Sequence, residues 1–226
     1  MKINSALKMV TVVGLLLAIP AQAVIVYNNP AALTGNELLG APLRLGMDFQ
    51  VNGPGTVSVL GAFDDGLDGF NGIPVEVGIF NLSDNSLVAS AIFSGSSYLY
   101  AGSSAIQAIA PVILGVGTYS IVASSYGNIA GPLERNYSAA YGPSGTPPTF
   151  NTAGGYLTSV GHREDIGEFG LAVPAGPIFV LTDPAFAAGT FDFTPVPEAE
   201  TFALVAVGLL GLVYIGRNYF AKQRVA

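Results

Sequence analysis

Turn-forming residues interrupt the chain about every ten residues between Val24 and Thr194. The turns are built from Gly, Pro, Ser, Thr and Asn, and the short segments between them are rich in Val, Ile, Phe and Tyr. No segment in this part shows a sustained helical period with caps. Short strands at such regular spacing are typical of an all-β sandwich or barrel.

Period-two alternation locates the strands, and it is clearest in Leu45–Val51, which follows an apolar–polar pattern. The turn Ser83–Ser86 predicts a hairpin between the flanking strands, and Leu114–Gly117 predicts a second hairpin. We expect an antiparallel sandwich of jelly-roll or Ig-like type. The predicted strands are Leu45–Val51, Thr56–Phe63, Val75–Phe80, Leu87–Phe93, Ile106–Val112, Thr118–Ser124, Phe179–Leu181 and Ala187–Phe193.

One domain of ordinary size fits the 171 residues from position 24 to 194. This span holds thirteen acidic residues, three arginines and no lysine, so its formal net charge is −10. Because an acidic surface repels phosphate backbones, nucleic acid is excluded as a partner. The chain has no cysteine, which excludes thiol catalysis and thiolate metal sites. Gly131–Ser159, with four prolines, is predicted to form a long loop.

The N-terminal residues 1–23 have the pattern of a secretory signal peptide. Lys2 and Lys8 give a positive start, and Met9–Ile19 is apolar. Ala21 and Ala23 are the small residues that signal peptidase needs, so we expect cleavage after Ala23. The alternative is an uncleaved membrane helix, for which the apolar run is short, since a bilayer core needs about 20 residues.

The C-terminal residues 195–226 show a second targeting pattern. A Pro-rich break is followed by the uncharged apolar run Phe202–Ile215, which predicts a single transmembrane helix. The basic residues behind the run are Arg217, Lys222 and Arg224. Because positive residues stay on the cytoplasmic side, the main body is expected outside the cell membrane. The alternative is a buried core helix.

Val196, Pro197 and Glu198, together with the apolar helix and the basic end, resemble the PEP-CTERM sorting domain of exported bacterial proteins. The resemblance implies recognition by exosortase, a membrane protease, and release or transfer to the cell surface. It also implies association with exopolysaccharide or biofilm material. Ala199 stands where the family's motif has a second proline. Met47–Ser124 in turn resembles a β-sandwich module of PEP-CTERM and bacterial surface proteins, which implies a fold and no activity.

One dense acidic cluster lies in the segment 64–72. Calcium prefers hard oxygen ligands, and glycines let a loop wrap around a cation. Its candidate ligands are Asp64, Asp65, Asp68 and Asn71. The segment lacks the spacing of an EF-hand, so the alternative is a solvated Asp-Gly turn between two strands.

Catalytic and sugar-binding patterns are weak. His162 could act as a base beside Asp165, but no nucleophile elbow accompanies it, so we interpret residues 162–165 as a charged turn before Ile166–Val173. Four tyrosines could stack against a sugar ring, and the alternative is that they are ordinary sheet tyrosines. They are Tyr98, Tyr100, Tyr137 and Tyr141.

These patterns predict an exported structural or interaction protein that is not an enzyme and needs no cofactor. It would be anchored in the envelope by its C-terminal helix and then reach the surface or matrix if processed. A carbohydrate- or calcium-binding module is the alternative, with calcium as the one candidate cofactor.

Overall fold

The computed structural model describes residues 22–31, 33–35, 41–127, 134–136, 138, 146–176 and 185–196. Residues Ala23–Pro195 form one compact unit. Almost all of the predicted signal peptide and the sorting segment beyond Val196 lie outside the described residues. Within the described ranges, no helix is long and apolar enough to cross a membrane.

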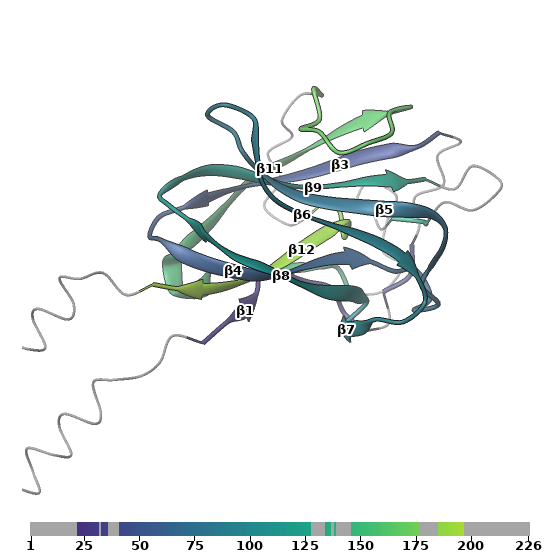
Figure 1. The fold of residues 1–226 in the computed structure, drawn as a ribbon, viewed down its shortest axis with the longest axis horizontal. Coiled ribbons are helices and arrows are strands. Elements are labelled where there is room, and N and C mark those ends of the chain that lie inside the picture. Colours follow the sequence, from purple (N-terminus) through teal and green to yellow (C-terminus); the bar gives the residue numbers. More distant parts are fainter. Residues whose placement is uncertain are drawn as a thin grey trace, which may run out of the picture. The chain divides into compact units, whose positions relative to one another are not determined.

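Two five-stranded antiparallel sheets make up the body (Figure 1). The first sheet has the strand order β1-β12-β4-β8-β7, the second has β11-β3-β9-β5-β6, and a separate pair joins β10 to β2. The predicted all-β antiparallel sandwich is confirmed. The strands are β1 (Val24–Ile25), β2 (Tyr27–Asn28), β3 (Leu43–Val51), β4 (Gly55–Phe63), β5 (Phe70–Asn81), β6 (Ser86–Gly95), β7 (Leu99–Ala101), β8 (Ser104–Leu114), β9 (Gly117–Tyr126), β10 (Thr149–Phe150), β11 (Leu157–Ile166) and β12 (Gly189–Pro195).

The core lies between the two sheets and is rich in aromatic side chains. Alternation in β3 turns Met47 and Phe49 inward, where both are almost fully buried. Phe49 meets Phe191 of β12 across the sandwich, with ring centroids 4.8 Å apart. Burial of each such side chain contributes about 2–3 kcal/mol to stability. The aromatic contact therefore fastens the second sheet to the first.

Seven of the eight predicted strands correspond to observed strands, and the predicted hairpin between β5 and β6 is confirmed. The predicted hairpin between β8 and β9 is wrong. Gly115 and Val116 carry the chain from one sheet to the other, so β8 pairs with β4 and β7 while β9 pairs with β3 and β5. A short turn can join neighbouring strands or cross between layers, and local sequence does not distinguish the two. The predicted strand Phe179–Leu181 falls outside the described residues.

Residues 162–165 are not a turn. They belong to β11, an outer strand of the second sheet, and the expected segment Ile166–Val173 is mostly a loop. Outer strands tolerate charged residues, which is why a polar sequence here still forms a strand. The predicted long loop Gly131–Ser159 is interrupted by β10, by a 3₁₀ helix at Ala153–Gly155 and by the start of β11.

Candidate functional site

The acidic loop, residues 64–69, links β4 to β5. Asp64 is fully buried, and its Oδ2 accepts hydrogen bonds from the Gly69 N–H at 3.0 Å and from the Tyr100 hydroxyl at 2.6 Å. A Cβ on Gly69 would lie 2.4 Å from the Ser96 Cα, so this position admits only glycine. Asp64 therefore closes its own loop and also ties it to β7.

The other three predicted calcium ligands are arranged differently. Asp65 accepts a hydrogen bond from the Gly35 N–H at 3.0 Å, and its Oδ2 lies 3.9 Å from the Arg135 Nε. Asp68 is exposed, and its carbonyl oxygen accepts a hydrogen bond from the Asn71 side chain. Among the described residues, no three Asp, Glu or His side chains converge at a spacing that would hold a metal.

Glu134 was not predicted, yet its pKa is shifted in part by this cluster. Burial, followed by the negative charges of Asp64 and Asp68, raises the Glu134 pKa from 4.5 to about 8. The Glu134 backbone is held by a bridge to Tyr126 and by a hydrogen bond from the Gly127 N–H. Only the fold brings it within range of the loop, because some 65 residues separate it from Asp68 in the chain.

Asp64 Oδ1 is buried and has no hydrogen-bond partner. The pKa of Tyr100 is also raised, first by burial and then by the hydrogen bond that its hydroxyl makes to Asp64. A proton or a cation would relieve this concentration of negative charge. We treat Asp64, Asp65, Asp68 and Glu134 as the acidic cluster and as the main candidate site.

His162 faces a different environment from the one a catalytic base requires. Its ring packs edge-on against Phe186 at 5.0 Å, and burial lowers its pKa. Asp165 is engaged elsewhere, because it accepts hydrogen bonds from the N–H groups of Ala175 and Gly176 and pairs with Arg44. The structure shows no contact between His162 and Asp165.

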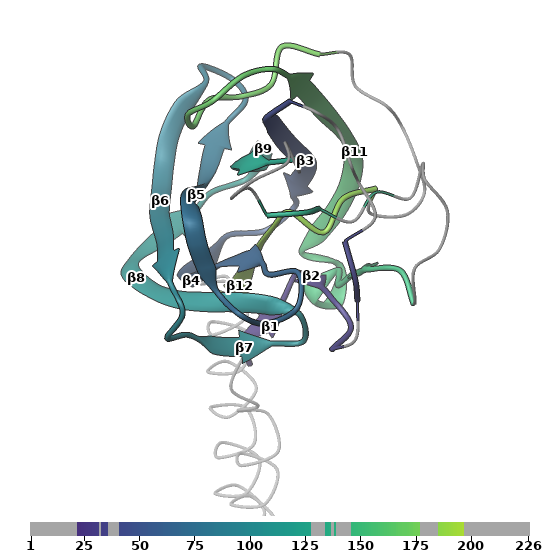
Figure 2. The same ribbon diagram turned by 90° about the vertical axis from the view of Figure 1, so that its right-hand side faces the viewer.

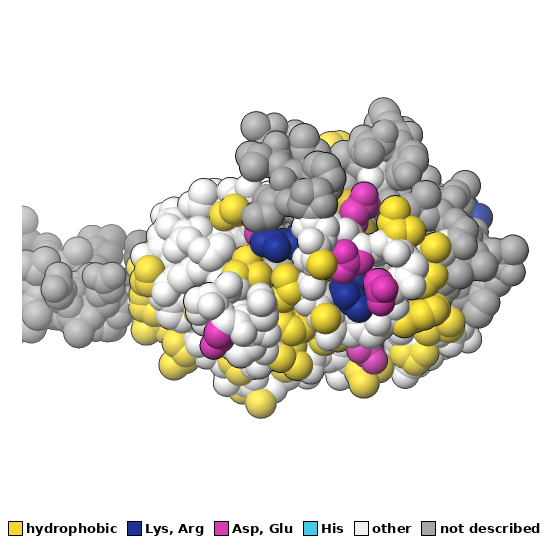
Figure 3. All heavy atoms as spheres, turned by 90° about the horizontal axis from the view of Figure 1, so that it is seen from above, with side chains coloured by type: hydrophobic (Ala, Val, Ile, Leu, Met, Phe, Trp, Pro, Cys, Tyr) yellow, Lys and Arg dark blue, Asp and Glu magenta, His cyan; other side chains and the backbone are white. Residues whose placement is uncertain are grey.

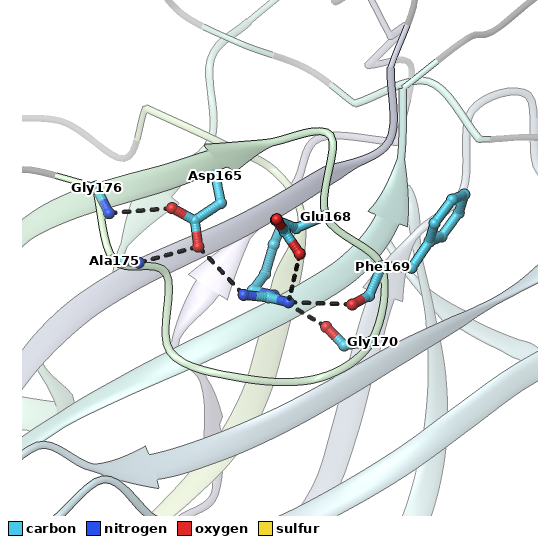
Figure 4. Close-up of polar contacts among 7 residues, drawn as sticks. Asp165, Glu168, Phe169, Gly170, Ala175 and Gly176 are labelled. Carbon is cyan, nitrogen blue, oxygen red and sulfur yellow. Dashed lines mark hydrogen bonds and ion pairs between the residues drawn. The ribbon is translucent and has the colours of Figure 1, made fainter.

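Arg44 fixes the loop that follows β11, residues 167–176 (Figure 4). Its guanidinium donates to the carbonyl oxygens of Phe169 and Gly170, each at 3.0 Å, and lies 3.2 Å from Asp165. Glu168 is a further partner at 3.9 Å. The Phe169 ring points away from the guanidinium and is 52% exposed. Figure 3 shows charged side chains of both signs gathered on this face.

Two of the predicted sugar-stacking tyrosines have structural roles. Tyr98 packs against Phe70 and Phe93, and its hydroxyl donates to the Ser94 carbonyl at 2.7 Å. Tyr100 is the partner of Asp64. Tyr137 and Tyr141 lie outside the described residues.

An open groove of about 550 Å³ lies along β1, β2 and β10. Among the described residues, its lining carries no charge and includes Phe150 and Asn151. Such a lining offers neither an acid–base group nor a carboxylate ligand.

Of the sorting motif, only Val196 is described, and it is 37% exposed just beyond β12. Pro197, Glu198, Ala21 and the basic residues Arg217, Lys222 and Arg224 lie outside the described residues. Ala23 is exposed directly before β1.

No family model and no curated protein matches this chain. Among solved structures, a chain from the crystal structure of the T13 IBDV viral particle is similar over 80% of this chain, at 10% identity and a TM-score of 0.18. The match spans 41% of that viral chain. A likeness this low carries no argument about fold or function.

Proposed function

We propose that this chain is an exported structural or interaction protein of the cell surface or extracellular matrix, sorted through its PEP-CTERM-like segment. The observation that best supports the proposal is the pairing of β1 with β12. Val24, the first residue after the expected signal cleavage, lies opposite Phe193, three residues before the sorting motif. Both targeting segments would therefore leave the body from neighbouring strands.

That arrangement fits a two-step export. The N-terminal segment directs the chain across the membrane, and the C-terminal helix holds it until an exosortase-type protease acts. Exposure of Val196 fits access by such a protease. The loop 167–176, which Arg44 holds through the carbonyl oxygens of Phe169 and Gly170, fits an interaction role, because an ordered loop loses less entropy when its exposed Phe169 binds a partner. Exopolysaccharide is the partner that the family resemblance suggests.

Within the sandwich class we favour the Ig-like type over the jelly roll. In Ig-like domains the second strand pairs with the fifth, and the third pairs with the sixth. Counting the main strands from β3 and leaving out the short β7, the equivalent pairs are β4 with β8 and β5 with β9.

Cell fractionation and intact mass test the proposal together. We expect a tagged full chain in the envelope or medium, with a mature N-terminus at Val24. Removal of the sorting protease should leave the C-terminal segment attached. Full-length protein in the cytoplasm would overturn the proposal.

A calcium-binding module is the second candidate, and it rests on the negative charge of the acidic cluster alone, since no three described Asp, Glu or His side chains converge at metal-binding spacing. Asp64 Oδ1 is buried without a partner, and the pKa of Glu134 is raised first by burial and then by the neighbouring aspartates. Calcium should raise the melting temperature of the wild type, and Asp68→Asn with Glu134→Gln should abolish the rise. Asp84→Asn, in the β5–β6 turn, is the matched control and should keep it. A wild type that calcium does not stabilise would exclude this candidate.

A further inference from the structure

The outer strands of the two sheets differ in how they are protected from pairing with another chain. Exposed strand edges carry unpaired N–H and C=O groups, and proteins protect them by shortness, charge, proline or bulges. In the first sheet, β1 has two residues and β7 has three. Beyond β7, the edge of β8 contains Pro111 within an irregular register opposite β4. In the second sheet, β11 carries Arg163, Glu164 and Asp165.

The remaining edge, β6, is protected at one end only, where the Tyr98 hydroxyl accepts a hydrogen bond from the Ser94 N–H and donates to the Ser94 carbonyl oxygen. Its ten residues include no charge and no proline, and among the described residues it pairs with β5 alone. The register with β5 is interrupted at Val88 near one end and again between Phe93 and Gly95 near the other, and the regular segment Ala89–Phe93 lies between these interruptions. Ile92 is 58% exposed on this segment. Figure 2 shows β6 and β11 at opposite margins of the same sheet.

The distribution of charged residues along the chain points to the same edge, β6. Residues 85–133 contain no Asp, Glu, Lys, Arg or His, although the body as a whole has a formal net charge of −10. This stretch includes all of β6 to β9. Two copies of an acidic protein repel each other where their carboxylates face one another, and that repulsion is least where neither copy carries charge.

We propose that β6 pairs antiparallel with β6 of a second copy of this chain. A strand is the required occupant, because lipid has no pattern of donors and acceptors to match the edge. A second copy is favoured because antiparallel pairing of one strand with itself is self-complementary, as a two-fold symmetric dimer requires. The pairing would join the second sheets of two copies into one continuous sheet.

Ile92→Lys is the decisive variant. Ile92 lies opposite Glu76 on β5, so a lysine there gains an opposite charge within its own sheet and should leave the fold intact. In the dimer it would place one lysine from each copy along the shared edge. We expect sedimentation of the full chain in mild detergent to show a dimer for the wild type. Ile92→Lys should weaken self-association about tenfold or more, which corresponds to about 1.4 kcal/mol.

Leu99→Lys on β7 is the matched control, because Leu99 is 77% exposed in the same uncharged stretch. It should remain dimeric. Since the chain has no cysteine, Ser90→Cys, Ile92→Cys and Ser94→Cys can also be compared singly, with Thr158→Cys on β11 as control. Antiparallel pairing brings a residue opposite its own copy only at the two-fold axis, so a disulfide-linked dimer should form from the β6 variant nearest that axis and not from the control.

Several results would overturn the proposal. These are a monomeric wild type, an Ile92→Lys variant that dimerises as well as the wild type, or a dimer sensitive to Leu99→Lys alone. Binding of a monomeric wild type to lipid vesicles would point instead to a membrane surface. None of these outcomes depends on where the protein is sorted, so they do not bear on the proposed export.

Discussion

Asp192 on β12 accepts a hydrogen bond of 2.7 Å from the main-chain N–H of Ser58 on β4. The same carboxylate accepts the Val59 N–H at 2.8 Å and the Ser58 hydroxyl at 2.6 Å. The register between β4 and β12 is interrupted here, so these N–H groups are not satisfied by a regular ladder. A buried side chain therefore replaces missing sheet hydrogen bonds in the middle of the first sheet.

Removing that carboxylate should destabilise the body strongly. Asp192→Ala leaves three donors of β4 without this acceptor, two of them main-chain N–H groups, and we expect a loss of about 2–4 kcal/mol in the free energy of unfolding. Asp192→Asn keeps one acceptor oxygen and should lose less. Urea denaturation measures both changes. The control is Asp84→Ala in the exposed β5–β6 turn, and an equal loss there would contradict the role of Asp192.

The Arg44 contacts should control the order of the loop 167–176. Arg44→Ala removes the donors that hold the carbonyl oxygens of Phe169 and Gly170. We expect faster cleavage within this loop by an added protease, because local opening becomes more frequent. Arg135→Ala is the control, since that side chain is 44% exposed and lies 3.9 Å from its partner. Similar cleavage of both variants would contradict the role of Arg44 in ordering this loop.

Much of the fold could be predicted because strand formation leaves a local pattern. The alternation in Leu45–Val51 reports a buried face directly, and β3 is observed with that face inward. The partner of each strand leaves no such pattern. Gly115 and Val116 were interpreted as a hairpin turn, but they lead from one sheet to the other, and only packing of the whole domain decides between these outcomes.

The candidate site shows the same limit. The acidic loop was visible because Asp64, Asp65 and Asp68 are close in sequence. Glu134 was not, because a separate segment of chain carries it, and a lone Glu has no motif. The orientation of Asp64 was equally hidden, since its hydrogen bonds to Tyr100 and Gly69 turn its carboxylate into the protein.

The effects of replacing Asp48 and Arg163 on stability should depend on each other, because the two side chains form an ion pair. Asp48 is fully buried, and the Arg163 Nε donates to its Oδ2 at 2.9 Å. Arg163→Met leaves a buried carboxylate unpaired, at a cost of about 3–5 kcal/mol in stability. Adding Asp48→Asn removes that unpaired charge, so the double variant should be more stable than Arg163→Met. Simple additivity of the two single changes in urea denaturation would contradict this coupling.

Glu134 should give the body a distinctive pH dependence. Its pKa is about 8 in the folded chain and 4.5 ordinarily, so between these values the folded chain holds a proton that the unfolded chain releases. Its contribution to stability is therefore complete below pH 4.5 and is lost as the pH rises through 8. We expect the melting temperature to fall from pH 5 to pH 9 more steeply in the wild type than in Glu134→Gln. Calorimetry at several pH values measures the difference.

Glu164→Gln on β11 is the control for this pH dependence, and it should keep the slope of the wild type. Each comparison of slopes cancels the contribution of the carboxylates that the two proteins share. Equal slopes in the wild type and Glu134→Gln would show that the Glu134 carboxyl titrates normally. The charges of Asp64 and Asp68 would then not raise the pKa of Glu134, and one of the two arguments for a cation at this end of the body would be lost.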